Sequence, residues 1–412
     1  MDKQRKNILM LITQMSMGGA EKVFFSHLIE FSKKYNVIPC VYTRKGFDPV
    51  YKSDHVWEEL DDKKIKGSLG RLLYRRKRLR ELVKKHKIDV CISHMEGPNI
   101  LSCISNLGNC KKIICIHGSI MGDSGKSASR KKLLNSYILP STYKYADAAV
   151  TVSKAMGQEL VSIGIKKEKV YSIPNFFDID RIRELSTASI GPFDSIMSEN
   201  RTIVHVGRLS LQKNQKVILD VMANLMRRGR TEKLFILGDG ERLEEMVVHA
   251  RNQGLSVYVQ NKTPLDSTFD VYFLGRQENP YRFISRSYLF ILSSFFEGFP
   301  LVLGESLACS TPVISVDCQT GPAEVLSCNS DNKPAVLQGP LKVYCGTLMP
   351  DWYTQSLNDE QLDMWAHAVI DVLDDPKRYE VLKAHCTQKV KCYSTENIVS
   401  SWFKLIDSVN GK

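Results

Sequence analysis

The sequence predicts an α/β protein built from two doubly wound domains. Three observations support this fold class. Short β-branched runs alternate with longer amphipathic segments, which is the rhythm of a parallel sheet crossed by helices. The rhythm stops at residues 187–200, a stretch rich in Ser, Gly and Pro, and then restarts. A length of 412 residues also suits two to three domains.

Each strand is predicted from a short run rich in Val, Ile and Leu. In the first half these runs are Ile8 to Ile12, Val37 to Tyr42, Val90 to Ser93, Ile113 to His117, Ala148 to Val152 and Val170 to Ile173. In the second half they are Ile203 to Val206, Lys233 to Leu237, Val271 to Leu274, Leu289 to Leu292 and Val313 to Val316.

The predicted domains are residues 1–186 and 201–393, with 187–200 as a linker. Residues 394–412 are predicted to form a C-terminal helix that packs back on the first domain. Ser394 is its expected N-cap, and Trp402 lies on its apolar face.

Composition and charge narrow the class of protein. With 43% apolar and 25% charged residues, the chain is neither collagen-like nor disordered. Residues 1–190 hold 34 basic and 19 acidic side chains, whereas 191–412 hold 23 and 26. An anionic partner is therefore expected at the first half. The eleven cysteines contain no CxxC pair, which predicts a reducing cytoplasm and no zinc site. Neither a signal peptide nor a membrane span is predicted.

Unusual residues follow the predicted strands. In open α/β sheets the ligand crevice lies beyond the carboxyl ends of the strands. These residues from both halves therefore predict one cleft between the two domains. They are Gly18, Gly19, Glu96, His117, Gly207, Arg208, Gly238, Gly275 and Glu297.

The strongest motif is FFEGFPLVLGE, from Phe295 to Glu305. Gly298 and Pro300 predict a turn with exposed backbone N–H groups, followed at once by a helix whose N-terminus attracts an anion. Glu297 in the loop can accept hydrogen bonds from sugar hydroxyls. Glu305, about one helical turn in, can reach ribose hydroxyls. As an isolated pair, two such acids would more often be helix-surface charge.

A basic pair follows in VGRLSLQKNQ. Arg208 and Lys213 lie in a loop after a predicted strand, and two cations beside a helix N-terminus can neutralise a diphosphate without a metal. Alone they would be surface charge, but together with the acids they form a site. LGDGE, with Gly238, is only a Gly-x-Gly after a strand and by itself is turn chemistry.

The order and spacing of nine segments resemble glycosyltransferase family 4 over nearly the whole chain. These segments are SMGGAEKV, IHGS, SIPNFFDIDR, VGRLSLQKN, LGDGE, FLGRQENPY, LSSFFEGFPLVLGESLACSTPVIS, GPAEVL and STENIVSSW. The resemblance implies a retaining enzyme of the GT-B fold that uses a nucleotide sugar. It also implies an N-terminal domain for the acceptor and a C-terminal domain for the donor.

The resemblance further implies residue roles. Arg208 and Lys213 match a pair that grips the donor diphosphate, Glu305 matches the acid on the ribose, and His117 matches a histidine near the transferred sugar. The implied catalytic residues are Glu297, His117, Arg208 and Lys213. The implied donor-binding residues are Gly18, Gly19, Arg208, Lys213, Gly238, Arg276, Gln277, Glu297, Gly298, Phe299, Pro300 and Glu305.

The segment GPAEVL resembles family members that use UDP sugars. The expected reaction is transfer of a hexose or N-acetylhexosamine to a lipid-linked glycan, lipopolysaccharide or polysaccharide, with no cofactor and no metal. Two alternatives remain open: a sugar-nucleotide epimerase or hydrolase of the same architecture, and a nucleic-acid-binding protein suggested by the charge. The nucleic-acid-binding alternative is weakened because the basic segment Arg71 to Lys87 has no interleaved aromatic residue beyond Tyr74.

Several other polar residues allow two interpretations. His94, Glu96 and Asn99 follow a predicted strand and can contact an acceptor or simply form a polar loop. Asp178 and Asp180 form the D-x-D of metal-dependent transferases of another fold, but here they follow Pro174 and Asn175 at the predicted domain crossover, so no metal is expected. His205 lies inside an apolar strand and is expected to be a core residue.

The segment Arg71 to Lys87 holds nine basic residues and one acid. Its apolar residues recur at helical spacing, so an apolar stripe is expected to dock on the domain and the basic face to point outward. We expect this face to hold the enzyme on the inner, cytoplasmic face of the plasma membrane through anionic lipid, with a solvated surface as the alternative. The expected membrane-binding residues are Arg75, Arg76, Arg78 and Arg80. The basic loop 119–132 is expected to form a mobile rim.

Overall fold

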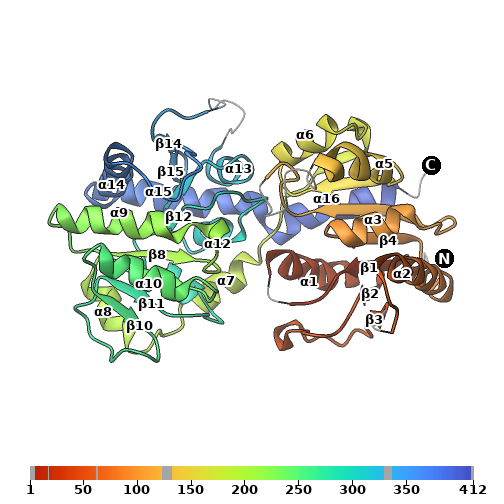
Figure 1. Ribbon diagram of the computed structural model, residues 1–412, viewed down its shortest axis with the longest axis horizontal. Helices are drawn as coiled ribbons and strands as arrows, with labels where there is room; N and C mark the ends of the chain where they lie inside the picture. The colour runs from red at the N-terminus through yellow and green to blue at the C-terminus, as the bar shows by residue number, and fades with distance from the viewer. Residues whose placement is uncertain (1–4, 17, 62–63, 123–131, 329–335, 410–412) are drawn as a thin grey trace. The chain divides into compact units, whose positions relative to one another are not determined.

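The computed structural model describes residues 5–16, 18–61, 64–122, 132–328 and 336–409. Within them, the chain forms two compact units, each a mainly parallel sheet flanked by helices (Figure 1). Unit 1 runs to Asn175 and resumes at Ile398, and unit 2 spans Phe176–Asn397. The predicted fold class is confirmed. Residues 123–131 of the expected basic rim lie outside the described residues.

Unit 1 contains seven parallel strands among its described residues, in the order β3-β2-β1-β4-β5-β6-β7. Leu9 and Leu11 of β1 pack with Leu79 and Leu82 of α2 in one core. The strands are β1 (Asn7–Ile12), β2 (Asn36–Val41), β3 (Glu58–Glu59), β4 (Val90–His94), β5 (Lys111–Ile116), β6 (Ala148–Thr151) and β7 (Val170–Ser172). The α-helices are α1 (Gly19–Ser32), α2 (Ser68–Lys85), α3 (Glu96–Ile104), α5 (Leu139–Tyr143), α6 (Lys154–Ser162) and, from Ile398 onward, most of α16 (Thr395–Ser408).

Helix α16 packs on α1 within unit 1. The ring of Trp402, only 1% exposed, lies 4.8 Å from that of His27 and 5.5 Å from that of Phe31. Ser394 Oγ accepts a hydrogen bond from the Asn397 N–H at 3.4 Å, as an N-cap does. The C-terminal segment therefore belongs to the core of the unit that holds the N-terminus.

Unit 2 contains eight strands among its described residues, in the order β10-β11-β9-β8-β12-β13-β15-β14. Only the β14–β15 pair is antiparallel. The strands are β8 (Thr202–Val206), β9 (Lys233–Leu237), β10 (Val257–Val259), β11 (Val271–Phe273), β12 (Leu289–Leu292), β13 (Val313–Val316), β14 (Leu341–Val343) and β15 (Gly346–Met349). The α-helices are α7 (Ile179–Ser186), α8 (Phe193–Glu199), α9 (Gln215–Arg227), α10 (Leu243–Asn252), α11 (Tyr281–Ile284), α12 (Leu301–Ala308), α13 (Pro322–Leu326), α14 (Asp359–Leu373) and α15 (Pro376–Lys389).

The predicted domain boundary is wrong. Residues 187–200 are not a linker, because they contain α8, and the preceding α7 also lies in unit 2. The ring of Phe193 in α8 packs edge-on against Phe235 at 6.2 Å and Tyr272 at 6.5 Å. Asn279 Nδ2 donates to the Leu185 carbonyl oxygen at 2.8 Å, which ties α7 to α11. Phe193, Ile196 and Met197 form the apolar face that the Ser- and Gly-rich composition obscured.

Each sheet has a topological switch point, where the strand order reverses. In unit 1 this point lies between β1 and β4, and in unit 2 it lies between β8 and β12. The loops that follow two such neighbouring strands leave toward opposite faces of the sheet, which opens a crevice at their carboxyl ends. The Arg208 loop follows β8 and the Glu297 loop follows β12, so the predicted donor residues of unit 2 flank its switch point.

Candidate active site

Two loops meet directly at the switch point of unit 2. Lys213, after β8, and Glu297, after β12, form an ion pair with Nζ 2.6 Å from Oε1. Their side chains are only 18% and 8% exposed. The sequence predicts that both residues contact the donor, but it does not predict that they contact each other. A desolvated pair of this kind is costly to break by removing one partner.

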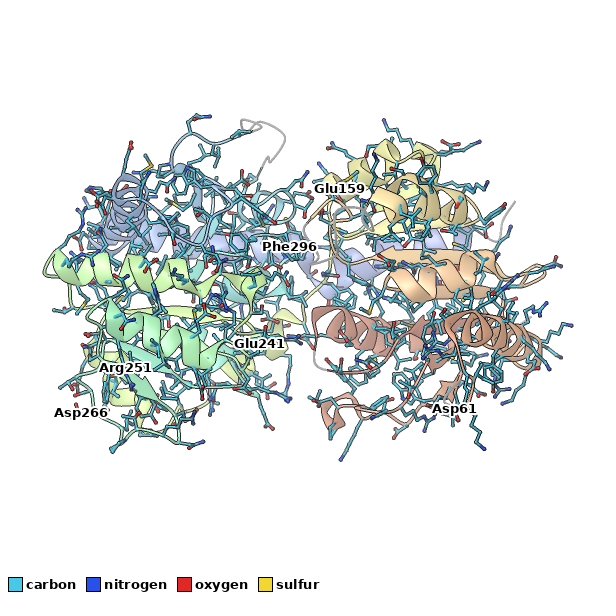
Figure 2. The ribbon with its side chains drawn as sticks, viewed as in Figure 1. Asp61, Glu159, Glu241, Arg251, Asp266 and Phe296 are labelled. Atoms are coloured by element: carbon cyan, nitrogen blue, oxygen red, sulfur yellow. The ribbon has the colours of Figure 1, made fainter. Side chains whose placement is uncertain are left out.

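The backbones of the same two loops are also joined. The Phe295 N–H donates to the Gln212 carbonyl oxygen at 2.9 Å, and Gln212 Nε2 donates to the carbonyl oxygen of Phe296 at 2.8 Å (Phe296 is labelled in Figure 2). Ser293 Oγ donates to the Lys213 carbonyl oxygen at 3.0 Å. The ion pair is therefore held at a fixed place by neighbours on both loops.

Helix α12 begins directly after the Glu297 loop, as predicted, and its N-terminus provides backbone N–H groups for an anion. Glu305 lies on this helix and is 4% exposed. Gly304 must be Gly, because a Cβ there would lie 2.2 Å from Cζ of Phe177. Gly298, Phe299 and Pro300, the predicted phosphate cradle, are buried in this arrangement.

Gly238 has a packing role. Its φ is +138°, and a Cβ would lie 2.1 Å from the Gly207 carbonyl oxygen. The Leu209 N–H donates to the Asp239 carbonyl oxygen at 2.9 Å. The loop after β9 therefore presses on the loop that carries Arg208, and Gly238 supports the predicted diphosphate residue through backbone contact.

The predicted donor-binding residues Arg276 and Gln277 follow β11. Arg276 is exposed, and its N–H donates to Asp239 Oδ1 at 3.0 Å. Gln277 turns inward, where its Nε2 donates to the Leu274 carbonyl oxygen at 2.8 Å and to Gln260 Oε1 at 3.1 Å. The Gln277 side chain is half-buried and therefore less accessible than that of Arg276 in this conformation.

At the switch point of unit 1, the β1–α1 loop is shaped by Glu21. A Cβ on Gly18 would lie 2.3 Å from Glu21 Oε2, and Ser16 Oγ donates to Glu21 Oε1 at 3.0 Å. Gly19 begins α1 and is exposed. The missing side chain of Gly18 thus makes room for the buried carboxylate of Glu21 in the first turn of α1.

Two of the three predicted acceptor residues are internal, which corrects that prediction. His94 is 0% exposed, and its Nδ1 lies 2.9 Å from Nε2 of His117. Asn99 is also 0% exposed: its Oδ1 accepts from Ser93 Oγ at 2.9 Å, and its Nδ2 donates to the Cys115 carbonyl oxygen at 2.9 Å. They bridge β4, α3 and β5 and leave no surface to an acceptor, whereas Glu96 is exposed.

His117 is half-buried and stacks on His94, with 13° between the ring planes. Burial lowers the pKa of His117 to about 4 and holds that of His94 well below its usual value. Both rings are therefore neutral near pH 7. Just after them, Ser119 Oγ donates to Glu159 Oε1 at 2.6 Å and the Ile120 N–H donates to Glu159 Oε2 at 2.9 Å, which anchors the segment to α6 (Glu159 is labelled in Figure 2).

The predicted basic face of α2 requires a further correction. Arg75 lies over the ring of Tyr42 at 4.0 Å, Arg76 Nη2 donates to the Ile104 carbonyl oxygen at 2.9 Å, and Arg78 pairs with Glu81 at 3.4 Å. Three of the four expected membrane residues are thus engaged within unit 1, and Arg80 alone of the four is fully exposed. Sequence periodicity showed the apolar stripe but not the long-range partners of Arg75 and Arg76.

Asp178 and His205 have clear structural roles. Asp178 caps α7, with its Oδ1 accepting from the Arg181 N–H at 3.0 Å. His205 is buried in β8 as predicted.

Among the described residues, no group of three His, Cys, Asp or Glu side chains is arranged to hold a metal ion. No described helix combines the length and apolar content that a membrane span requires.

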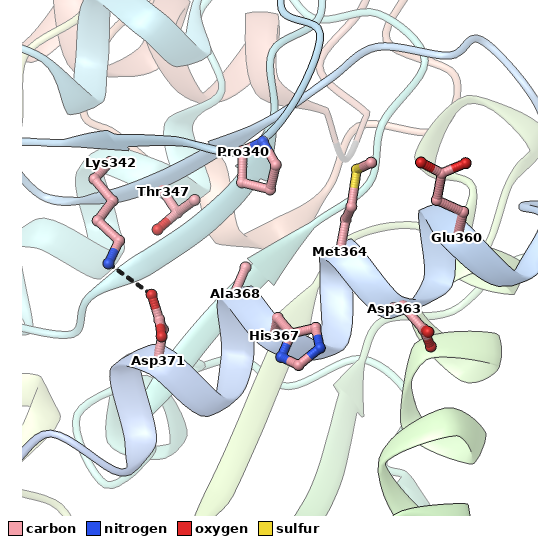
Figure 3. Close-up of a pocket in the computed structure, with 9 residues that line it drawn as sticks. All are labelled: Pro340, Lys342, Thr347, Glu360, Asp363, Met364, His367, Ala368 and Asp371. Atoms are coloured by element: carbon pink, nitrogen blue, oxygen red, sulfur yellow. Dashed lines mark ion pairs between the residues drawn. The ribbon is translucent and has the colours of Figure 1, made fainter.

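A groove of about 640 Å³ lies elsewhere in unit 2, between the β14–β15 hairpin and α14 (Figure 3). Lys342 and Asp371 pair across it at 2.7 Å, and Met364 and His367 line it from the helix. None of the described residues that line it is a predicted donor residue. We therefore take the switch point, where charged groups converge, as the candidate active site.

Family models match both halves of the chain. The model described as Glycosyltransferase Family 4 matches residues 17–181, and that described as Glycosyl transferases group 1 matches residues 193–333. The chain belongs to glycosyltransferase family 4. The first match contains the Gly18 loop and His117, and the second contains the Lys213–Glu297 pair and Glu305.

Among curated proteins, this glycosyltransferase is 27% identical over 406 residues to an uncharacterized glycosyltransferase of Methanocaldococcus jannaschii, covering 88% of this chain and 94% of the relative. It is 23% identical over 408 residues to the GalNAc-alpha-(1->4)-GalNAc-alpha-(1->3)-diNAcBac-PP-undecaprenol alpha-1,4-N-acetyl-D-galactosaminyltransferase of Campylobacter jejuni, covering 98% of each chain. Among solved structures, Anabaena HepE in complex with UDP and glucose matches with a TM-score of 0.73 and 17% identity, covering 98% of this chain and 100% of that one. The likeness to glycosyltransferase structures shows the GT-B fold.

Proposed function

We propose that the protein is a retaining glycosyltransferase that moves a hexose or N-acetylhexosamine from a UDP-sugar to a lipid-linked glycan, lipopolysaccharide or polysaccharide. One observation carries the proposal: Lys213 and Glu297 meet at the switch point of unit 2, beside the N-terminus of α12. A cation for a diphosphate and a carboxylate for sugar hydroxyls are thereby brought together in one place.

Names of similar proteins support the donor and the acceptor class. HepE was crystallised with UDP and glucose, and the Campylobacter relative is named for transfer of N-acetylgalactosamine to an undecaprenol-linked glycan. A lipopolysaccharide 1,6-galactosyltransferase of Escherichia coli is 25% identical over 185 residues. The HepE complex supports a UDP-linked donor, and the two transferase names support a lipid-linked or lipopolysaccharide acceptor.

In the proposed reaction, the bond between the anomeric carbon and the donor phosphate breaks, and the acceptor oxygen bonds to the same face of that carbon. The departing phosphate oxygen takes the acceptor proton. Arg208, Lys213 and the N-terminus of α12 stabilise the charge that develops on the diphosphate. Glu297 orients the sugar and Glu305 the ribose. The scheme needs no protein nucleophile and no divalent metal.

A donor panel tests this proposal. We expect the purified protein, in excess chelator, to add one hexose or N-acetylhexosamine mass to a lipid-linked glycan extract from one or more UDP-sugars, with release of UDP. Mass spectrometry detects the product. Release of free sugar or an epimerised donor without glycan extension would instead support the hydrolase or epimerase alternative.

We also propose that α2 contacts an anionic lipid surface, with a different set of residues from that expected. Leu69 and Leu73 are 68% and 52% exposed, and Lys77, Arg80 and Lys84 continue the same helical stripe in exposed positions. An apolar and basic stripe of this kind suits a helix that lies at a membrane surface.

Replacing Lys77, Arg80 and Lys84 with Gln should weaken binding to vesicles rich in anionic lipid by about 100-fold, because each basic residue contributes about 1 kcal/mol near such a surface. The matched control replaces the exposed Lys144, Lys166 and Lys167, elsewhere in unit 1, and should bind as the parent does. Cosedimentation at low and high salt measures both. Equal losses in the two triple variants would point to net charge and refute a specific α2 surface.

A further inference from the structure

A buried His205–Gln215 pair connects strand β12 to the loop that carries Arg208. Both side chains are 0% exposed. His205 Nδ1 lies 3.0 Å from the carbonyl oxygen of Ile291, and His205 Nε2 lies 3.2 Å from Nε2 of Gln215. The same amide nitrogen donates to the carbonyl oxygen of Arg208 at 2.8 Å. The contacts form a chain from the sheet to the backbone of a predicted diphosphate residue.

The chemistry of the partners fixes each hydrogen in this chain. The Ile291 carbonyl can only accept, so His205 carries its hydrogen on Nδ1 and presents the Nε2 lone pair to Gln215. The two amide hydrogens of Gln215 then serve His205 and the Arg208 carbonyl. Burial lowers the pKa of His205 to about 4, so the ring is neutral near pH 7. The Ile291 carbonyl, His205 Nε2 and the Arg208 carbonyl therefore each face a donor.

The hydrogen bond from Gln215 to the Arg208 carbonyl lies between two backbone hydrogen bonds of the same loop. The residues on either side of Arg208 are held through their N–H groups, by hydrogen bonds from Gly207 to the Leu237 carbonyl and from Leu209 to the Asp239 carbonyl, both 2.9 Å. Gln215, the first residue of α9, holds the carbonyl of Arg208 itself. The peptide plane after Arg208 is thus set from inside the unit.

We propose that His205 and Gln215 are positioning residues that hold the Arg208 backbone in the conformation that binds the donor diphosphate. The inference rests on the proposed function, since it takes the Arg208 loop to be the diphosphate site. It assigns a role in binding to a histidine that the sequence identifies only as a core residue.

Two single variants and their double variant test this chain of hydrogen bonds from Ile291 through His205 and Gln215 to Arg208, which we call the relay. Gln215→Leu and His205→Phe should each weaken UDP binding about three- to tenfold, the effect of one lost hydrogen bond, while leaving the affinity for uridine unchanged. The double variant should lose no more than either single variant, because both interrupt one chain. Nuclear magnetic resonance titration of UDP and uridine measures all of them.

Thr311→Val provides the matched control. Thr311 is 1% exposed and donates from Oγ1 to the Ile284 carbonyl oxygen at 2.8 Å, away from the Arg208 loop. This variant should lose thermal stability without losing UDP affinity. Parent-like UDP affinity in the relay variants, or an equal loss for UDP and uridine, would overturn the relay. A parent protein that binds no UDP would instead contradict the proposed function. If one single variant fails to fold, the other carries the same test.

Discussion

Replacing Lys213 with Met should weaken UDP binding by about 10- to 150-fold and nearly abolish sugar transfer. A charged hydrogen bond to the diphosphate contributes about 1.5–3 kcal/mol, which is the source of that range. In the free protein the Lys213 ammonium is 2.6 Å from Glu297, so the diphosphate must share or replace this carboxylate. Added magnesium should not restore the activity.

Replacing Glu297, the partner of Lys213, should have the opposite effect on the affinity for UDP. Glu297→Gln removes the carboxylate that competes for Lys213, so UDP should bind more tightly than to the parent, while transfer falls at least tenfold because the sugar loses its ligand. Lys233→Met is the control, since Lys233 pairs with Asp270 at 3.7 Å with side chains only 10% and 15% exposed. Calorimetric titration with UDP that found one affinity for all these proteins would refute the shared role of the pair.

Replacing Trp402 with Ala should lower the free energy of unfolding of unit 1 by about 3–5 kcal/mol, the cost of a large cavity in a well-packed core. Trp402 is 1% exposed and contacts His27 and Phe31 of α1. Phe403→Ala should cost less, because the Phe403 side chain is only half-buried. Denaturant unfolding followed by circular dichroism gives both values. A Trp402→Ala protein within 1 kcal/mol of the parent would show that α16 adds little to unit 1.

The elements that could be predicted from the sequence are those that a local pattern of residues specifies. Strands such as β1 and β12, and the helix after the Glu297 loop, follow from apolar periodicity and turn residues next to one another in the chain. The short strands β3, β10, β14 and β15 were missed, because their segments EE, VYV, LKV and GTLM contain too short an apolar run to be recognised. Helix α8 was missed for another reason: its apolar face was judged by composition and not by spacing.

The side-chain partners in the site could not be predicted in the same way. Lys213 and Glu297 are 84 residues apart, and Arg75 meets Tyr42 only because α2 docks beside β2. His94 ends β4 and Asn99 lies in α3 just after it, where binding residues are expected, yet both side chains are buried. Burial and pairing of this kind depend on tertiary contacts, which no local pattern contains.

The anomeric configuration of the product tests retaining, metal-free transfer most directly. With an α-linked UDP-sugar identified from the donor panel, the reaction is run in excess chelator and the new linkage is assigned from the coupling constant of its anomeric proton. We predict an α-linked product at the rate seen without chelator. A β-linked product would contradict retention, and transfer that stops until a divalent ion is added would contradict neutralisation of the diphosphate by Arg208 and Lys213.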